Sequence, residues 1–315
     1  MKKLLFLIVL FFINISFLYS QKASTTSGII EGQKLSQLKK DLVNITNTPK
    51  PRNYKNVSIL NNVANYIKAE LKKVCDSVAF QEYDVNGEVY KNVIGSLGIK
   101  NKERLIIGAH YDVFGNSNGA DDNASGVTGL LKLARLLSRE DLPFRIDFVA
   151  YALEEPPFFR TKKMGSYIHA KYLSDIKVPV KGMICLESIG YFNEEENSQK
   201  YPVKKMELYY GKKGDFITIV TNKESAFSTS IIESMTKEQK IKTHVFKGSP
   251  QNITGVDFSD HLNYWKFNYN AIMITNTAFY RNNNYHKKSD KIETLDLKKM
   301  GSVIHQLYKA IKKME

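Results

Sequence analysis

Histidine and carboxylate side chains occur at separate positions between residues 110 and 286, each beside an apolar run or a helix start. One such residue alone carries little information, because acidic residues are common at helix starts, where they cap free N–H groups. The combination is informative, since two imidazoles and three carboxylates are a donor set that suits a divalent ion such as Zn²⁺. The candidate metal ligands are His110, Asp122, Glu155, Glu187 and His286.

The number of donors predicts two ions rather than one. A single tetrahedral site needs only three protein ligands and a water, which would leave carboxylates unused. If Asp122 bridges two ions ~3.5–4 Å apart, each ion receives one histidine and one further carboxylate. Glu154 is adjacent to the candidate ligand Glu155, and is then free to act as a general base on a shared water. Asp112 follows His110 by two residues and is expected to hold the other ring nitrogen of that histidine.

Most of the candidate ligands directly follow a predicted strand. Fully or mostly apolar runs predict strands over residues 105–109, 144–153, 182–186 and 271–275, and helical periodicity recurs over 125–139, 165–173, 223–237 and 295–312. Apolar strands that alternate with helices predict a three-layer α/β/α sandwich around a mixed, mostly parallel sheet. Because ligands gather beyond the carboxyl ends of the strands in such a sheet, we expect the candidate residues to share one rim.

The N-terminal third of the sequence predicts two helices and a hairpin before this sheet begins. Helices are expected over residues 35–45 and 61–74, and strands over 79–85 and 89–97 are joined by Asn86-Gly87, a hairpin signal. No repeat, linker or composition shift divides the chain after residue 30. We therefore expect a single domain over residues 21–315, because a domain boundary between residues 110 and 286 would split the predicted rim.

The first 20 residues are typical of a secretory signal peptide. Lys2 and Lys3 precede an apolar run that continues to Leu18, and Ser20-Gln21 offers a small residue before a polar one. Such a signal would direct the chain to the periplasm or the cell exterior and would be cleaved near Ser20. An uncleaved anchor is the alternative, although the apolar stretch is shorter than the ~20 residues a span prefers. No stable membrane insertion is expected after cleavage.

Composition excludes several classes of protein. With 43% apolar and 25% charged residues, the chain is neither disordered nor fibrous. Its 2 cysteines cannot supply the disulfides of a disulfide-stabilised protein of 315 residues. Cys185 lies in an apolar run and is expected to be a buried thiol, with a disulfide to Cys75 as the alternative. The net charge of +14 invites a nucleic-acid interpretation, but the lysines are scattered in short runs, which argues against a nucleic-acid partner. A monomer is expected.

Six motifs occur in a fixed order between residues 110 and 286. They are His110-Tyr111-Asp112, Gly119-Ala120-Asp121-Asp122-Asn123-Ala124-Ser125-Gly126, Glu154-Glu155, Glu187-Ser188-Ile189-Gly190-Tyr191, Ser259-Asp260-His261 and Thr277 to Asn282 with Tyr285-His286. Together they resemble the co-catalytic zinc aminopeptidases of peptidase family M28, the bacterial leucyl aminopeptidase-like enzymes, and the resemblance extends over roughly residues 90–312. It implies a zinc exopeptidase fold, two Zn²⁺ per chain and hydrolysis of N-terminal residues from peptides or proteins.

The resemblance also implies roles for single residues. His110 and Glu187 would hold one zinc, Glu155 and His286 the other, with Asp122 between them and a cis peptide bond after it. Glu154 would take a proton from the attacking water and pass it to the leaving amine.

Two positions depart from the pattern of many members. Glu187 stands where simple aminopeptidases of the family have Asp, and the tyrosine that some members place before Ser259-Asp260-His261 is missing. Tyr280 is a possible substitute for that tyrosine, and His261 is a candidate pocket residue. The other histidines are expected to lie in the core or at the surface: His169 in a helix, His244 in a strand-like run over residues 242–246, and His305 on the last helix.

Other activities stay open on the same fold. A glutaminyl cyclase would bind one zinc with fewer ligands, and the intact His110-Tyr111-Asp112 argues against it. Carboxypeptidase or dipeptidase specificity and a metal-free binding homologue are the remaining alternatives, the last of which should lack one or more of the ligands or the base.

Overall fold

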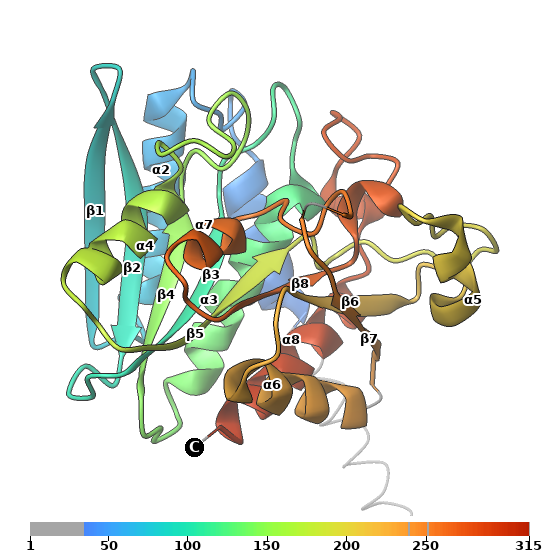
Figure 1. Cartoon of the computed structure of the whole chain (residues 1–315). Coiled ribbons are helices and arrows are strands. Elements are labelled where there is room, and N and C mark those ends of the chain that lie inside the picture. The colour runs from blue at the N-terminus through green and yellow to red at the C-terminus, as the bar shows by residue number, and fades with distance from the viewer. Residues whose placement is uncertain (1–34, 239, 251, 315) are drawn as a thin grey trace, which may run out of the picture.

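The computed structural model describes residues 35–238, 240–250 and 252–314. The predicted signal peptide lies outside this part of the chain. Eight strands form one sheet in the order β1-β2-β4-β3-β5-β8-β6-β7 (Figure 1). Four of its seven strand pairs are parallel, namely β3–β4, β3–β5, β5–β8 and β6–β7. The strands are β1 (Ser77–Val85), β2 (Glu88–Leu97), β3 (Arg104–His110), β4 (Arg145–Tyr151), β5 (Val180–Glu187), β6 (Phe216–Thr221), β7 (Lys242–Lys247) and β8 (Ala271–Thr275).

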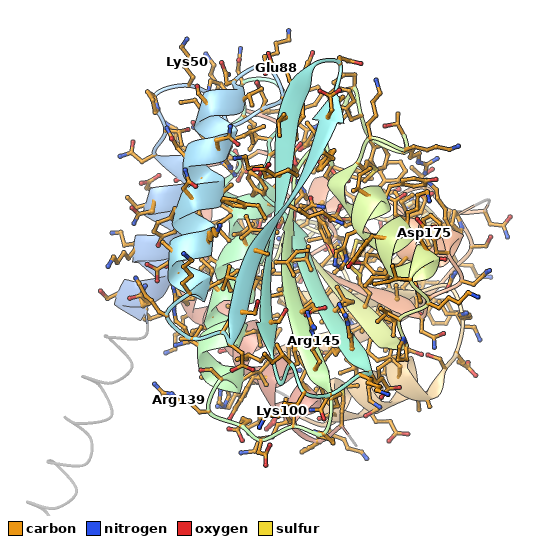
Figure 2. The ribbon with its side chains drawn as sticks, turned by 90° about the vertical axis from the view of Figure 1, so that its left-hand side faces the viewer. Lys50, Glu88, Lys100, Arg139, Arg145 and Asp175 are labelled. Atoms are coloured by element: carbon orange, nitrogen blue, oxygen red, sulfur yellow. The ribbon has the colours of Figure 1, made fainter. Side chains whose placement is uncertain are left out.

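Helices cover both faces of the sheet, as predicted. Figure 2 looks onto the β1–β2 edge and shows a helical layer on either side of the strands. Along β3, Leu105 and Ile107 enter one buried cluster with residues of α2, α3, α6 and α8, whereas Ile106 enters the other with residues of α4 and α7. Successive side chains of a strand point to opposite faces, so burial on both faces makes β3 apolar throughout. The helices are 35–46, α2 (Val57–Leu71), α3 (Gly126–Leu137), α4 (Gly165–Asp175), α5 (Glu207–Tyr210), α6 (Ala226–Lys237), α7 (His261–Lys266) and α8 (Leu297–Lys312), with short turns η1 (Ala120–Ser125), η2 (Lys204–Met206), η3 (Ala278–Tyr280) and η4 (Ile292–Thr294).

The three-layer mixed sheet confirms the predicted fold class. The hairpin forms as expected, because Asn86 and Gly87 both adopt positive φ, 59° and 84°, which suits the tight turn between twisted strands. The predicted ends of helices and strands were less accurate than their predicted types. The helix predicted from Asn61 begins at Val57 and ends at Leu71, and the strand predicted over 144–153 spans only Arg145–Tyr151.

One strand was absent from the sequence prediction. β6, with the sequence Phe-Ile-Thr-Ile-Val-Thr, joins the sheet antiparallel to β8 and parallel to β7. Its β-branched residues were the signal that could have found it. Both cysteines are free thiols, and Cys185 is fully buried in β5 as expected. Within the described residues, no helix has the length and apolar character needed to cross a membrane.

Candidate metal centre

The carboxyl ends of four neighbouring strands bring the candidate ligands together. His110 is the last residue of β3 and Glu187 the last of β5, and these strands are parallel neighbours. β4 lies on the other side of β3, and the turn after it carries Glu154 and Glu155. His286 arrives from the loop after β8, the next neighbour of β5. Strand order therefore assembles the rim that the sequence predicted.

Asp122 lies at the middle of this rim. It belongs to η1, the irregular turn that opens α3, and a cis peptide bond joins it to Asn123, as the family resemblance implied. Its Oδ1 lies 3.3 Å from His110 Nε2, and its Oδ2 lies 3.3 Å from His286 Nε2. The two oxygens of one buried carboxylate thus face two different imidazoles.

Two groups of donors share Asp122. In the first group, His110 Nε2 lies 3.3 Å from Glu187 Oε2, and in the second, His286 Nε2 lies 3.2 Å from Glu155 Oε2. The donor atoms of each group lie within 4.8 Å of one another. Ligands ~2.1 Å from one ion at a tetrahedral angle are separated by ~3.4 Å, so these spacings suit donors placed around an ion.

The hydrogen bonding of the site also fits metal binding. Among the described residues, the buried atoms His286 Nε2 and Glu155 Oε1 have no hydrogen-bond partner. Buried polar atoms without a partner are rare in folded proteins, and donor atoms that bind an ion are one physical reason for such an exception. The donors present, imidazole nitrogen and carboxylate oxygen, are those that Zn²⁺ takes.

The electrostatics of the cluster favour positive charge at its centre. Burial opposes ionisation of Asp122, but contacts with His110 and His286 outweigh it and hold the pKa of that carboxyl well below its usual range. Burial likewise opposes protonation of His286, and contacts with Asp122 and Glu155 nevertheless raise its pKa to about 10. In a cluster of carboxylates, protons on the histidines supply the charge that bound cations would otherwise supply.

Glu154 lies in the same cavity but at a greater distance from the histidines. Its Oε2 is 3.9 Å from His110 Nε2, compared with 3.2–3.3 Å for the four contacts described above. Burial raises the pKa of Glu154 well above its ordinary value, since the charged form is poorly solvated there. A carboxyl with a raised pKa near the ligands is suited to proton transfer.

Asp112 has contacts that differ from the sequence expectation. Its Oδ1 lies 3.6 Å from His110 Nδ1, longer than a hydrogen bond, and that ring nitrogen has no partner among the described residues. The carboxylate instead accepts the backbone N–H groups of Glu154 and Glu155, each at 3.1 Å. Asp112 therefore fixes the turn that presents both glutamates.

Arg52 supports the centre and was missed by sequence reasoning. It is only 1% exposed and donates to the carbonyl oxygens of Tyr111, Asn118 and Gly119 at 2.8, 2.6 and 2.5 Å. These bonds join the lead-in segment to the turns that carry His110 and Asp122. Gly119 has φ of 58°, and a Cβ there would lie 2.3 Å from the Asp122 carbonyl oxygen, so only glycine fits. A lone arginine in a proline-containing segment carries no sequence signal for this role.

Further hydrogen bonds fix the remaining ligands. Ser259 Oγ donates to Glu187 Oε2 at 2.7 Å, which gives the Ser259-Asp260-His261 motif a role at the site. Asp290 accepts the backbone N–H groups of Asp121 and Asp122 at 3.0 and 3.1 Å. Asp121, buried beside Asp122, accepts hydrogen bonds from Gly190 N, Tyr191 N, Asn276 Nδ2 and Asn282 Nδ2.

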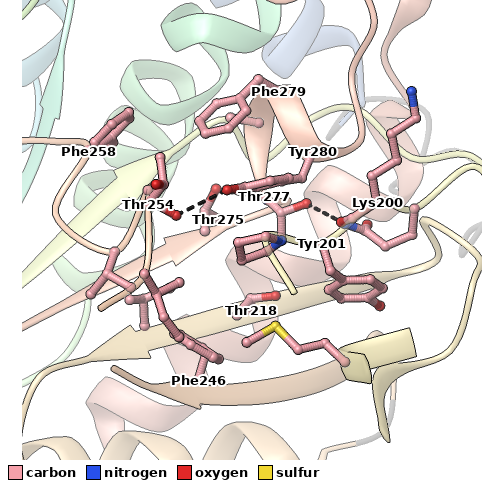
Figure 3. Close-up of a pocket in the computed structure, with 18 of the residues that line it drawn as sticks. Lys200, Tyr201, Thr218, Phe246, Thr254, Phe258, Thr275, Thr277, Phe279 and Tyr280 are labelled. Carbon is pink, nitrogen blue, oxygen red and sulfur yellow. Dashed lines mark hydrogen bonds between the residues drawn. The ribbon is translucent and has the colours of Figure 1, made fainter. Parts of the chain in front are cut away.

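The metal cavity opens beside an apolar cavity. Glu187, Thr254, Phe258, Phe279 and Tyr285 line both, so the two cavities share a wall. The apolar cavity has a volume of about 90 Å³ and is shown in Figure 3. Its floor and sides come from the β6, β7 and β8 strands and the segment before α5, including Thr218, Val220, Phe246, Met273, Thr275, Tyr201 and Met206.

The sequence candidates around these cavities had mixed outcomes. Tyr280 lines the apolar cavity and donates to the Thr254 carbonyl oxygen at 3.2 Å (Figure 3). It is not among the residues that line the metal cavity, whereas Tyr285 is. His261 is not a pocket residue, because it is fully buried against Trp265 with Nε2 2.8 Å from the Val256 carbonyl oxygen. His244 lines the apolar cavity.

A comparison with protein families identifies the chain. The model of Peptidase family M28 matches residues 92–311. The chain belongs to this family. All the candidate ligands, and both Asp112 and Glu154, fall within the matched residues. Membership in family M28, with the buried donor clusters, makes the chain a metallopeptidase.

Three proteins are similar to this chain. Uncharacterized protein YfbL of Escherichia coli is 38% identical over 315 residues, covering 96% of this M28 chain and 97% of that protein. The LapA aminopeptidase of Legionella pneumophila has a TM-score of 0.69 at 19% identity, covering 88% of this chain and 70% of that one. A glutaminyl cyclase of Bacteroides thetaiotaomicron has a TM-score of 0.63 at 17% identity, covering 90% of this chain and 97% of that one. The two structures share the fold with this chain.

Proposed function

We propose that this M28 chain is an exported di-zinc aminopeptidase that removes N-terminal residues from peptides or proteins. The placement of Asp122 carries the proposal, because each of its oxygens lies 3.3 Å from a different histidine. One carboxylate shared by two donor groups is the arrangement that a two-ion site needs. A site for one ion would leave the second histidine and a carboxylate without a role.

The residues divide into two ligand sets. His110 and Glu187 would hold one Zn²⁺, Glu155 and His286 the other, and Asp122 would bridge them. When bound, the ions supply Lewis acidity that polarises the scissile carbonyl and lowers the pKa of water. Asp112, Arg52 and Ser259 act earlier, because their hydrogen bonds hold the ligands and the Glu154 turn in place before substrate arrives.

Glu154 is proposed to move the proton. Its carboxylate accepts a proton from the attacking water at an Oε atom and then donates it to the leaving amine. The longer distance to His110 and the raised pKa of Glu154 both support a role different from that of the ligands. Burial between the ligands and the apolar wall lets the carboxyl hold that proton until the amine departs.

The apolar cavity is proposed to take the side chain of the N-terminal residue. It begins at the wall shared with the metal cavity and is lined mainly by aromatic and aliphatic side chains. A peptide whose first carbonyl lies at the metal cavity has its first side chain close to this wall. Residues with large apolar side chains are therefore the expected substrates, because burial in the cavity removes apolar surface from water.

The remaining organisation follows from the sequence. Residues 1–20 are proposed to be a signal peptide cleaved near Ser20, and residues 21–315 a single catalytic domain acting as a monomer in the periplasm or outside the cell. Peptide N-termini would be its partners.

A substrate panel tests the proposed activity. The zinc-loaded enzyme should cleave leucyl and phenylalanyl amides and peptides with a free N-terminus, and fail on N-acetylated forms of the same peptides. Chelation should abolish turnover, and added Zn²⁺ should restore it. Cleavage of acetylated peptides from the C-terminus would show a carboxypeptidase, and cyclisation of N-terminal glutamine without hydrolysis would show a cyclase. A fully metallated chain that is inactive on every free-amine substrate would refute the proposal.

A further inference from the structure

A short segment beside the apolar cavity has two faces of different character. Residues 200–213 leave the body of the protein and return to it, and the Gln199 N–H donates to the Lys212 carbonyl at 3.0 Å to close the segment at its base. Tyr201 OH donates to the Gly211 carbonyl at 2.8 Å and its ring stacks on Tyr210. Figure 1 shows α5, at the centre of this segment, at the outer edge of the molecule beyond β6 and β7.

The outward face of the segment is apolar at its tip. Leu208 is 80% exposed, Tyr209 74% and Val203 48%, which makes the first two the most exposed large apolar residues of the described chain. Scattered apolar residues on a surface are ordinary, but three within seven residues on one projecting turn are a local concentration. The inward face, by contrast, supplies Tyr201, Met206 and Tyr210 to the wall of the apolar cavity.

Lysines flank this apolar tip along the chain. Residues 200–213 contain five lysines, at positions 200, 204, 205, 212 and 213, and a single acid, Glu207. Lys204, Lys205 and Lys212 are exposed and form no ion pair within the described part of the chain. Lys213 pairs with Glu196 at 3.2 Å, and the neighbouring Glu194 pairs with Lys299. The charge presented beside Leu208 and Tyr209 is therefore strongly positive.

From this combination we propose that the outward face of residues 200–213 docks the protein on an anionic lipid bilayer. Exposed leucine and tyrosine enter the boundary between headgroups and acyl chains, where an amphipathic aromatic ring is well accommodated. Lysines on both sides of them attract the negative headgroups, and their stems allow the ammonium groups to remain in water.

The shape and charge of the segment favour a lipid surface over other partners. A second copy of the chain would bring two sets of lysines together, and like charges at an interface oppose association. An acidic peptide needs a groove for its side chains, whereas this face is a projecting turn. The inference does not depend on the proposed peptidase activity, because none of Val203, Lys204, Lys205, Leu208 and Tyr209 lines either cavity.

Vesicle co-sedimentation tests the docking surface. The exported chain should sediment with vesicles of equimolar phosphatidylcholine and phosphatidylglycerol, not with phosphatidylcholine alone, and added salt should weaken the association. The double variant Lys204→Glu with Lys205→Glu should lower the vesicle partition coefficient by about tenfold or more. The double variant Leu208→Ser with Tyr209→Ser, which keeps the charge, should lower it as well. The Tyr209→Trp variant should gain fluorescence that brominated lipids quench.

A matched charge reversal is the control. Lys39 and Lys40 are adjacent, exposed lysines on the helix over residues 35–46, and Lys39→Glu with Lys40→Glu changes net charge by the same amount. This control should retain vesicle binding, and thermal unfolding should show that all variants are folded. The proposal is overturned if the wild-type chain ignores anionic vesicles, if both surface variants bind like wild type, or if the control loses binding equally. A dimer in gel filtration that Leu208→Ser with Tyr209→Ser dissociates would also overturn it, by showing that a second copy covers the tip.

Discussion

Glu154 and Glu155 are adjacent carboxylates with different proposed roles, so the same substitution at each gives a matched pair. Glu154→Gln keeps the shape of the side chain but removes its ability to accept a proton. Glu155→Gln removes a charged donor whose Oε2 lies 3.2 Å from His286 Nε2. Both backbone N–H groups are held by Asp112 at 3.1 Å, which should keep the turn in place in either variant.

The two substitutions are expected to affect different quantities, the rate of turnover for Glu154→Gln and the zinc affinity for Glu155→Gln. A general base typically contributes 10²–10⁴-fold, so Glu154→Gln should raise the activation barrier by about 3–5 kcal/mol. Metal content should stay near two ions per chain, because Glu154 lies 3.9 Å from His110 Nε2, outside the shorter contacts. Loss of a residue that hydrogen-bonds to a metal ligand weakens metal binding by about 10–100-fold. Glu155→Gln should weaken zinc binding by more than this, because it removes a charged ligand.

Elemental analysis and kinetics on the same preparations separate the outcomes. Each variant is loaded with Zn²⁺, passed over a desalting column, and assayed for zinc per chain and for kcat and KM on leucyl amide. We expect two zinc ions and a low kcat for Glu154→Gln, and fewer than two zinc ions for Glu155→Gln. If Glu154→Gln loses zinc as readily as Glu155→Gln, then Glu154 is a ligand and the assignment of the base is wrong. Full activity of Glu154→Gln would be equally damaging.

Three further predictions concern the bridge, its support and the buried core. Asp122→Asn should leave at most one zinc ion per chain by elemental analysis, because an amide offers one acceptor oxygen in place of two; two retained ions would contradict the bridging role. Arg52→Lys should lower the free energy of unfolding by about 3 kcal/mol, since an ammonium cannot reach all three carbonyls, and an unchanged denaturation midpoint would refute the argument. Burial lowers the pKa of His169 to about 4, below the ~6.5 of an unfolded chain. The buried neutral histidine therefore costs no stability above pH ~6.5. As pH falls from ~6.5 toward 4, the free energy of unfolding decreases, because the unfolded chain takes up the proton first. His169→Gln should therefore reduce the acid-induced loss of stability by up to about 3 kcal/mol in chelator-treated samples, as measured by urea unfolding at several pH values; parallel pH curves for variant and wild type would contradict it.

Sequence reasoning predicted the fold class and the assembly of the rim because both depend on local patterns. Apolar runs of strand length, alternating with helical periodicity, predict a sheet buried on both faces, and β3 and β5 conform to this. Once such strands are parallel neighbours, polar residues at their carboxyl ends must meet. His110 and Glu187 could therefore be placed together although 77 residues separate them along the chain.

The sequence did not reveal the contacts that hold the site together. Arg52 binds three backbone carbonyls, and Asp112 binds two backbone N–H groups in place of the expected ring nitrogen. Every residue offers such backbone groups, so nothing in the side-chain pattern marks the partners. β6 was missed, and with it the floor of the apolar cavity.

The sequence by itself determined the donor types, their order and the sheet that collects them, because these follow from side-chain chemistry and periodicity. Only the tertiary structure decided that the two oxygens of Asp122 face separate histidines, that Tyr285 and not Tyr280 lines the metal cavity, and that Leu208 projects among lysines. Each of these outcomes depends on how loops far apart in the chain pack at the ends of the sheet. Loop packing is set by many contacts at once, and no spacing rule along the chain encodes it.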